Sequence, residues 1–194
     1  MARLSTATYV KDGYGQVEPN HLSAQRTSQI YAQLPAAAGI SVLENGQFVK
    51  YDYAHNVVNF TGAGEWMMVF NEVKLYDDFW RETYKDYAMQ AKNFTPGKNA
   101  VAGEDGKLPG EMVPRVIKIN VGDIYTTNCL EKGNTDGKDK VEGTENLDAG
   151  TLLTPNAQGY LSTVGAADAD MQFEVAKVYT LADGQAAVKV MRIK

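Results

Sequence analysis

The side chains that could perform nucleophilic catalysis are few and lie far apart in the sequence. The 194-residue chain has one cysteine, Cys129, and two histidines, His21 and His55. A serine or cysteine nucleophile needs a base close to it, but His21 lies in a polar N-terminal stretch and His55 beside a turn. We therefore expect both histidines to be surface or turn residues and Cys129 to be a half-buried small hydrophobic residue. A Cys/His zinc site cannot be assembled from these three residues.

Carboxylates are more frequent, and two of them at a suitable separation can act as general acid and base. The candidate pairs are Asp77-Asp78, Glu104-Asp105 and Asp168 with Asp170. Each pair stands in a turn-like or cap-like context, where Asp is common for local reasons. We therefore predict no catalytic residue and interpret the chain as non-enzymatic.

Two patterns in the polar segment 131–150 are similar to known binding motifs, but the spacing of their residues does not match those motifs. The stretch GNTDGK at 133–138 is one residue short of a phosphate-binding loop, and no Ser or Thr follows its lysine. The acidic and amide residues around it suggest a calcium loop, but Gly137 is out of place and Lys138 occupies a ligand position. A solvated polar loop explains both patterns. We predict no cofactor and no metal.

Composition limits the partners that the chain can have. The formal net charge is -5 and the sequence pI is about 5.1, so the protein has no general field that attracts phosphate backbones or anionic lipids. No apolar run approaches the roughly 18 residues of a membrane helix, and none near the N-terminus fits a signal peptide. We expect no nucleic-acid or membrane partner and synthesis in a cytoplasm.

Residues 1–34 differ in composition from the rest and predict an extended N-terminal arm. Ser, Thr, Gln and Asn outnumber large apolar residues there, and Pro35 and Gly39 close the segment. Residues 20–34 could form a thin amphipathic helix, whose apolar face is too narrow to fold alone. The arm should then bind a neighbouring surface. Its predicted partner-binding residues are Tyr9, Tyr14, Ile30, Tyr31 and Leu34.

Residues 35–194 read as a β-rich domain, because short apolar runs alternate there with Gly, Asn and Asp. The pair Asn45-Gly46 predicts a type I′ hairpin turn, and Asp183-Gly184 predicts a second hairpin near the C-terminus. The expected strands are 40–43, 48–53, 57–60, 66–75, 116–124, 152–153, 159–164, 173–180 and 186–193.

The middle of the domain contains three segments of different character. Helical spacing of Trp80, Tyr84 and Tyr87 favours one helix over 77–94. A Gly- and Pro-rich stretch marks a sub-boundary near 95–112, and 131–150 has almost no large apolar residue and should be an exposed loop. The predicted fold class is mainly β, a small β-barrel or β-sandwich with an N-terminal arm and one helix in the middle.

Several segments resemble the small β-barrel domains of decoration, or cement, proteins on tailed-phage heads. They are VPRVIKINVGDIYTTN at 113–128, GTLLTPNAQGYLS at 150–162 and the closing FEVAKVYTLADGQAAVKVMRIK at 173–194. Residues 36–60, with AGISVLENGQFVKYD, look similar to a second strand-turn-strand unit. The resemblance covers about half the chain through diffuse patterning.

This resemblance implies a structural protein that binds and stabilises an assembled capsid. The implied partners are the major capsid protein and neighbouring copies of the chain, which is then a homo-oligomer or a multi-copy component at the capsid surface. No catalytic residue is implied. The alternative from the residues is a receptor- or carbohydrate-binding module that uses Tyr and Trp rings on loops.

Overall fold

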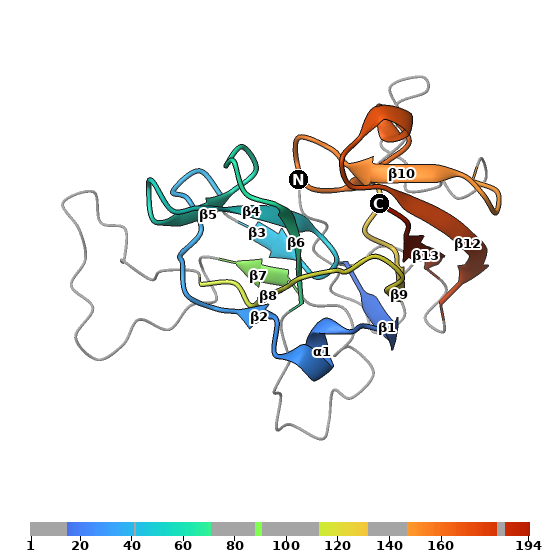
Figure 1. Cartoon of the computed structure of the whole chain (residues 1–194), viewed down its shortest axis with the longest axis horizontal. Helices are drawn as coiled ribbons and strands as arrows, with labels where there is room; N and C mark the ends of the chain where they lie inside the picture. The colour runs from blue at the N-terminus through green and yellow to red at the C-terminus, as the bar shows by residue number, and fades with distance from the viewer. Residues whose placement is uncertain (1–14, 41, 71–87, 91–112, 132–146, 182–184) are drawn as a thin grey trace.

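The computed structural model describes residues 15–40, 42–70, 88–90, 113–131, 147–181 and 185–194, and it is mainly β (Figure 1). Two antiparallel sheets dominate it. The first has the strand order β1-β9-β13-β12-β10-β11, and the second has the order β2-β8-β6-β4-β5. This confirms the predicted mainly β fold class in its sandwich form, because the strands do not close into a barrel.

The strands of the six-stranded sheet are β1 (Val17–His21), β9 (Ile124–Thr127), β10 (Leu152–Pro155), β11 (Leu161–Ser162), β12 (Phe173–Thr180) and β13 (Ala186–Arg192). Those of the five-stranded sheet are β2 (Ile30–Tyr31), β4 (Phe48–Asp52), β5 (Val57–Asn59), β6 (Trp66–Val69) and β8 (Val116–Ile117). A two-stranded sheet pairs β3 (Val42–Glu44) with β7 (Ala88–Gln90), and the helical turns are α1 (Ala24–Thr27) and the 3-10 turn η3 (Ala166–Asp168).

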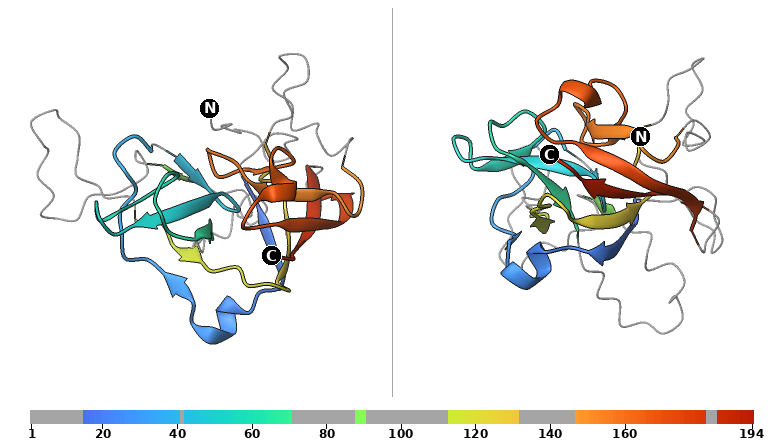
Figure 2. Two further views of the ribbon diagram at one scale, coloured as in Figure 1. Left: turned by 45° about the horizontal axis from the view of Figure 1, so that its top comes forward. Right: turned by 45° about the vertical axis from the view of Figure 1, so that its right-hand side comes forward.

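Figure 2 shows the ribbon from two further sides. Buried side chains from both large sheets form one hydrophobic core, which we call core 1. Phe173 contacts aromatic rings from both sheets, with its ring 5.4 Å from that of Phe48 in the five-stranded sheet and 5.9 Å from that of Tyr125 in the six-stranded sheet. Aromatic pairs at such separations add to the stabilisation from area burial. The buried members of core 1 are Leu22, Ala24, Phe48, Met68, Ile117, Ile119, Tyr125, Leu130, Leu153, Leu161, Met171, Phe173, Val175, Val188 and Val190.

The C-terminal hairpin was predicted from sequence and is confirmed. Strands β12 and β13 pair antiparallel from one end to the other except for a register shift between Val175 and Lys177, and Val175 lies opposite Val190. Both valines are fully buried in core 1, together with Phe173 and Val188, so alternate residues of the two strands share one face as expected. The turn residues 182–184 lie outside the described residues.

The five-stranded sheet is apolar on both faces. In β6, Trp66 and Met68 contact core 1, whereas Met67 and Val69 contact a second cluster, core 2. Core 2 is formed by Leu43, Val49, Tyr51, Val58, Val69 and Val116. A strand covered on both faces carries a continuous apolar run instead of an alternating one, which accounts for the sequence WMMV.

The Asn45-Gly46 turn exists, but the predicted type I′ hairpin is wrong. Strand β3 pairs with β7, and β4 pairs with β5 and β6, so the turn joins two different sheets. Gly46 has φ of 89° and Asn45 is not among the residues with positive φ, whereas a type I′ turn needs both. The amide of Gln47 bonds to the carbonyl of Glu44 at 3.1 Å, as in a type II turn.

The N-terminal segment corrects the expectation of an arm, because its described part belongs to both sheets. Strand β1 pairs with β9, and β2 pairs with β8. The helix expected over 20–34 is limited to α1 and ends at Ser28, which has a left-handed φ of 57°. Leu22 and Ala24 are buried in core 1. The segment is polar because edge strands need apolar side chains on one face only.

The remaining expectations concern the middle of the chain. Within the expected helix 77–94, residues 88–90 form strand β7 instead, and the rest of it lies outside the described residues. The sub-boundary near 95–112 and residues 132–146 of the expected exposed loop also lie outside them. The expected strand 116–124 is divided into β8 and β9 by a turn at 120–123.

Replacing Leu22 by Ala tests whether the N-terminal segment is part of the core. Leu22 is only 5% exposed, so we expect L22A to lower the free energy of unfolding by about 2–4 kcal/mol in urea denaturation. The exposed Arg26 on the same segment is the control, and R26A should change stability by less than about 0.5 kcal/mol. If L22A is as neutral as R26A, the segment is not core.

Replacing Tyr125 by Phe tests the packing at the centre of core 1. The Tyr125 hydroxyl is fully buried and has no hydrogen-bond partner among the described residues, and burial raises its pKa well above 10.0. Removing an unsatisfied hydroxyl should raise the free energy of unfolding by about 1 kcal/mol. The control is Y51F, because the Tyr51 hydroxyl accepts a bond from the Gln33 amide at 3.4 Å and its loss should destabilise. A destabilised Y125F protein would contradict the assignment of an unsatisfied hydroxyl.

Candidate functional site

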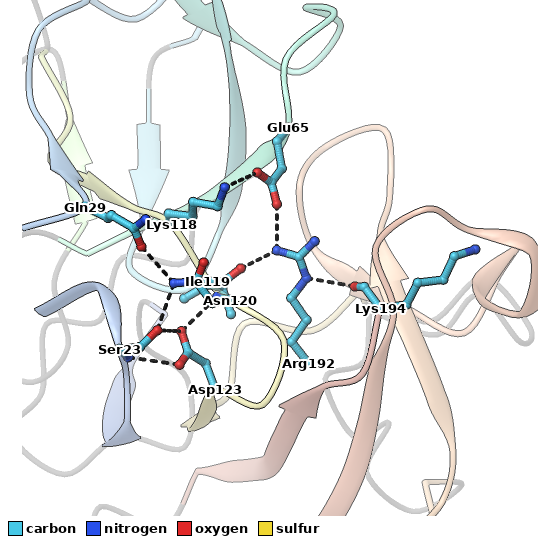
Figure 3. Close-up of polar contacts among 9 residues, drawn as sticks. All are labelled: Ser23, Gln29, Glu65, Lys118, Ile119, Asn120, Asp123, Arg192 and Lys194. Carbon is cyan, nitrogen blue, oxygen red and sulfur yellow. Dashed lines mark hydrogen bonds and ion pairs between the residues drawn. The ribbon is translucent and has the colours of Figure 1, made fainter. Parts of the chain in front are cut away.

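A densely hydrogen-bonded polar site lies where the chain crosses twice between the two large sheets. One crossing runs from β1 through α1 to β2, and the other runs from β8 through the turn at 120–123 to β9. The crossings lie against each other because β1 pairs with β9 and β2 pairs with β8. We call the polar site between them the junction (Figure 3).

Asp123 is the centre of the junction, and it is 1% exposed. Its Oδ1 accepts a hydrogen bond from the Ser23 amide at 2.9 Å. Its Oδ2 accepts one from the Ser23 hydroxyl at 3.1 Å and one from the Asn120 amide at 2.8 Å. A buried carboxylate is costly unless several donors replace its water, and these three bonds do so. The carboxylate therefore fixes α1 against the turn.

The Asn120 side chain extends the junction towards β2. Its amide nitrogen donates to the Ser23 hydroxyl and to Gln29 Oε1, both at 2.8 Å. The Lys118 amide donates to the Gln29 carbonyl at 3.1 Å, next to the β2–β8 pairing. Side chains and main chain thus hold both ends of α1.

Three charged residues connect the junction to the C-terminal strand. The Arg192 guanidinium donates to Glu65 at 2.6 Å and to the Ile119 carbonyl, while Lys118 lies 3.1 Å from the other Glu65 oxygen. Partial burial opposes ionisation of Glu65, but hydrogen bonds and charges from Arg192 and Lys118 outweigh it and hold its pKa below 4.5. The two large sheets are therefore joined by ion pairs as well as by core 1.

A second polar site fixes the start of β1. The buried Glu44 carboxylate accepts bonds from the Gly15 amide at 3.0 Å and from the Tyr160 hydroxyl at 2.7 Å. The Gln16 amide donates to Asn128 at 2.5 Å, and Asn128 donates to Gln185 at 2.7 Å. A side chain on Gly15 would meet the Asn45 carbonyl oxygen, so only glycine fits there.

The predicted partner-binding residues do not form one exposed surface. Tyr9 and Tyr14 lie outside the described residues. Ile30 packs against core 1, whereas Tyr31 and Leu34 pack against core 2. The apolar contacts of these three residues are thus with the chain's own cores.

Three exposed apolar side chains were missed by sequence reasoning. Tyr53 is 67% exposed, Val121 is 65% exposed and Val164 is 77% exposed. Each stands at a turn braced by a polar side chain. Asp52 accepts from the His55 amide beside Tyr53, Asp123 accepts from the Asn120 amide beside Val121, and the Ser162 hydroxyl accepts from the Val164 amide itself. The pattern of an apolar residue within a capped turn is the signal that could have found them.

Tyr53 continues a row of aromatic rings that includes one predicted residue. The rings of Tyr31 and Tyr51 are 5.9 Å apart, and those of Tyr51 and Tyr53 are 5.7 Å apart, both edge-on. The inner rings belong to core 2, so they hold Tyr53 from one side. Tyr53 is the end of the row that reaches solvent.

Of the groups considered for catalysis, Asp77, Asp78, Glu104 and Asp105 lie outside the described residues, and His55 has a local structural role. The hydrogen bond from His55 to Asp52, 2.8 Å long, closes the turn and holds the pKa of Asp52 below its usual value. Cys129 is 3% exposed, more deeply buried than expected. Asp168 and Asp170 are both exposed. Among the described residues, no cluster of three or more His, Cys, Asp or Glu could hold a metal ion.

Comparisons with known proteins found no match among protein families, curated proteins or solved structures. In the part of the chain that the structure describes, no helix is long and apolar enough to span a membrane.

Replacing Glu65 by Gln tests the ion pairs that join the sheets. The pKa of Glu65 is lower in the folded protein than its ordinary value of 4.5. The ionised carboxylate therefore stabilises the fold fully above about pH 4.5, and this stabilisation disappears as the pH falls through the folded pKa. The stability difference between the wild type and E65Q should be constant near neutral pH and shrink below pH 4.5. A difference that does not change between pH 7 and pH 3 would contradict the ion pairing.

Proposed function

We propose that the chain is a non-enzymatic virion structural protein that binds and stabilises the assembled capsid of a tailed phage, as a decoration or cement protein. The observation that supports this most is the position of the segments that carry the resemblance. The segments 113–128, 150–162 and 173–194 supply five consecutive neighbours of the six-stranded sheet, in the order β9-β13-β12-β10-β11. The first of these segments also supplies β8 of the five-stranded sheet, and residues 36–60 supply β3, β4 and β5. Three segments that are separate in the sequence thus contribute adjacent strands of the six-stranded sheet.

The proposed mechanism is attachment through many weak contacts. Tyr53, Val121 and Val164 are exposed apolar side chains on braced turns, so they lose little conformational freedom on binding. Because Ile30, Tyr31 and Leu34 pack inside the chain, we assign the contacts to these three turn residues and, from sequence, to Tyr9 and Tyr14. Many copies on one shell convert modest affinity into firm attachment. A protein that binds only the assembled shell stabilises it by mass action.

The proposed partners are the major capsid protein and neighbouring copies of the chain at the capsid surface. The proposal includes no catalytic step, cofactor, nucleic acid or membrane.

A carbohydrate- or receptor-binding module is the second candidate, and one observation favours it. The exposed Tyr53 ring lies beside the polar groups of Asp52 and His55 on the same turn. Sugars bind to an aromatic face with hydrogen-bonding groups at its edge. Binding to a glycan array that Y53A abolishes would favour this module over the decoration protein.

The decoration function is tested with phage heads made without the chain. Added protein should sediment with the heads, saturate, and raise the temperature at which they release DNA. The variant Y53S/V121S/V164S should bind at least about tenfold more weakly, since each truncated contact is worth about 1 kcal/mol.

The control variant changes three exposed alanines on other turns, A63S/A157S/A167S, and should bind like the wild type. Both variants should keep the melting temperature of the isolated protein. Absence of sedimentation with the heads would contradict the proposed function, and equal binding of both variants would contradict the assigned contacts.

A further inference from the structure

Residues 15–31 form one continuous segment at the edge of both large sheets. Strand β1 is the terminal strand of the six-stranded sheet, and β2 is the terminal strand of the five-stranded sheet. No strand of either sheet lies outside them in the described part of the chain. The segment can therefore leave its place without disturbing the order of the other strands.

The chain provides a complete binding site for this segment. The main-chain edges of β9 and β8 pair with β1 and β2. Asp123, Asn120 and Thr126 accept or donate side-chain hydrogen bonds to Ser23, Gln29 and Asn20, at sequence separations of 91 to 106 residues. Leu22 and Ala24 supply the apolar anchors in core 1. These contacts are specific to the sequence of residues 15–31, so the same segment from a second copy of the chain fits the site along β9 and β8.

The link between the segment and the remainder of the chain is short and partly exposed. After β2, Ala32 and Gln33 are exposed. The Gln33 amide donates to the Tyr51 hydroxyl at 3.4 Å, and Leu34 packs against core 2. The next main-chain anchors are the bond from the Val58 amide to the Pro35 carbonyl, 2.7 Å, and the one from the Ala37 amide to the Val58 carbonyl, 2.9 Å. Residues 32–34 can therefore act as a hinge once the contacts of Gln33 and Leu34 are released, while the chain from Pro35 onwards stays in place.

We propose that residues 15–31 exchange between two copies of the chain, so that the segment of one copy occupies the edges of β9 and β8 in the other. The contacts between the two copies are the same as those within one copy, so the surfaces that must fit together already exist. The extent of exchange therefore depends on the protein concentration. The second copy then contributes Ser23 and Gln29 to the junction around Asp123. Exchange is a property of the free chain and does not depend on capsid binding.

A disulfide across the β1–β9 ladder detects which copy supplies the segment. Glu18 and Thr126 are directly opposite each other, and Thr126 is fully buried, so a thiol at 126 is reached only by a seated segment. The substitutions E18C and T126C are made on separate full-length chains that also carry C129A, which removes the native thiol. The two proteins are mixed, incubated at increasing concentration and oxidised.

Exchange predicts a shift from monomer to disulfide-linked heterodimer on non-reducing gels, with peptides containing positions 18 and 126 joined in the mass spectrum. The yield should rise with concentration. The control mixture, E174C with M191C, uses directly opposite positions of β12 and β13 within the body of the fold, and it should give no such heterodimer.

Both cysteines placed on one chain, E18C/T126C, show whether the disulfide can form at all, which is needed to interpret a mixture that gives no heterodimer. If that protein forms the disulfide only within single chains at every concentration, and the mixture gives no heterodimer, exchange is excluded. The neighbouring pair V17C with T127C is measured in the same way, so the outcome does not depend on the geometry of one pair. A heterodimer from either pair supports exchange, and none from both overturns it.

Discussion

The buried carboxylate of Asp123 is the interaction on which the arrangement of the two sheets depends. A charge with 1% exposure is stable in the fold only while its donors stay in place, and those donors belong to Ser23 and Asn120, 97 residues apart in the chain. Satisfying Asp123 therefore requires both crossings between the sheets to be present at once. Once α1 is fixed there, β1 and β2 lie beside β9 and β8, and Leu22 and Ala24 complete core 1.

This constraint explains why polar and apolar residues have different structural roles. Core 1 holds the sheets face to face, but apolar contact is non-directional and does not set how the strands cross. The directional bonds of the junction do so, and the ion pairs of Glu65 with Arg192 and Lys118 extend them to the C-terminal strand. In the proposed decoration function, a body fixed in this way can present Tyr53, Val121 and Val164 without rearranging on binding.

Sequence reasoning succeeded where local pattern and tertiary role coincide. Phe173, Val175, Val188 and Val190 alternate with residues on the opposite face, and the β12–β13 hairpin follows from that alternation. It failed for the Asn45-Gly46 turn, because β3 pairs with the distant β7, which no local signal specifies, and β4 pairs with β5 and β6 instead of β3. The N-terminal segment was taken for an arm because its few apolar residues, among them Leu22 and Ala24, are too sparse for a recognisable period. Asp123 was overlooked since an Asp after Gly in a turn is ordinary, and only Ser23, 100 residues away, reveals its role.

The most direct test of the account is a double-mutant cycle between Asp123 and Ser23, measured by urea denaturation. Loss of charged hydrogen bonds in D123N should lower the free energy of unfolding by about 1.5–3 kcal/mol, whereas D168N at an exposed carboxylate should change it by less than about 0.5 kcal/mol. Because the two residues act as one unit, D123N and S23A together should cost at least about 1 kcal/mol less than the sum of the single changes. A D123N protein as stable as D168N, or strictly additive effects in the cycle, would contradict the claim that this carboxylate holds the two crossings together.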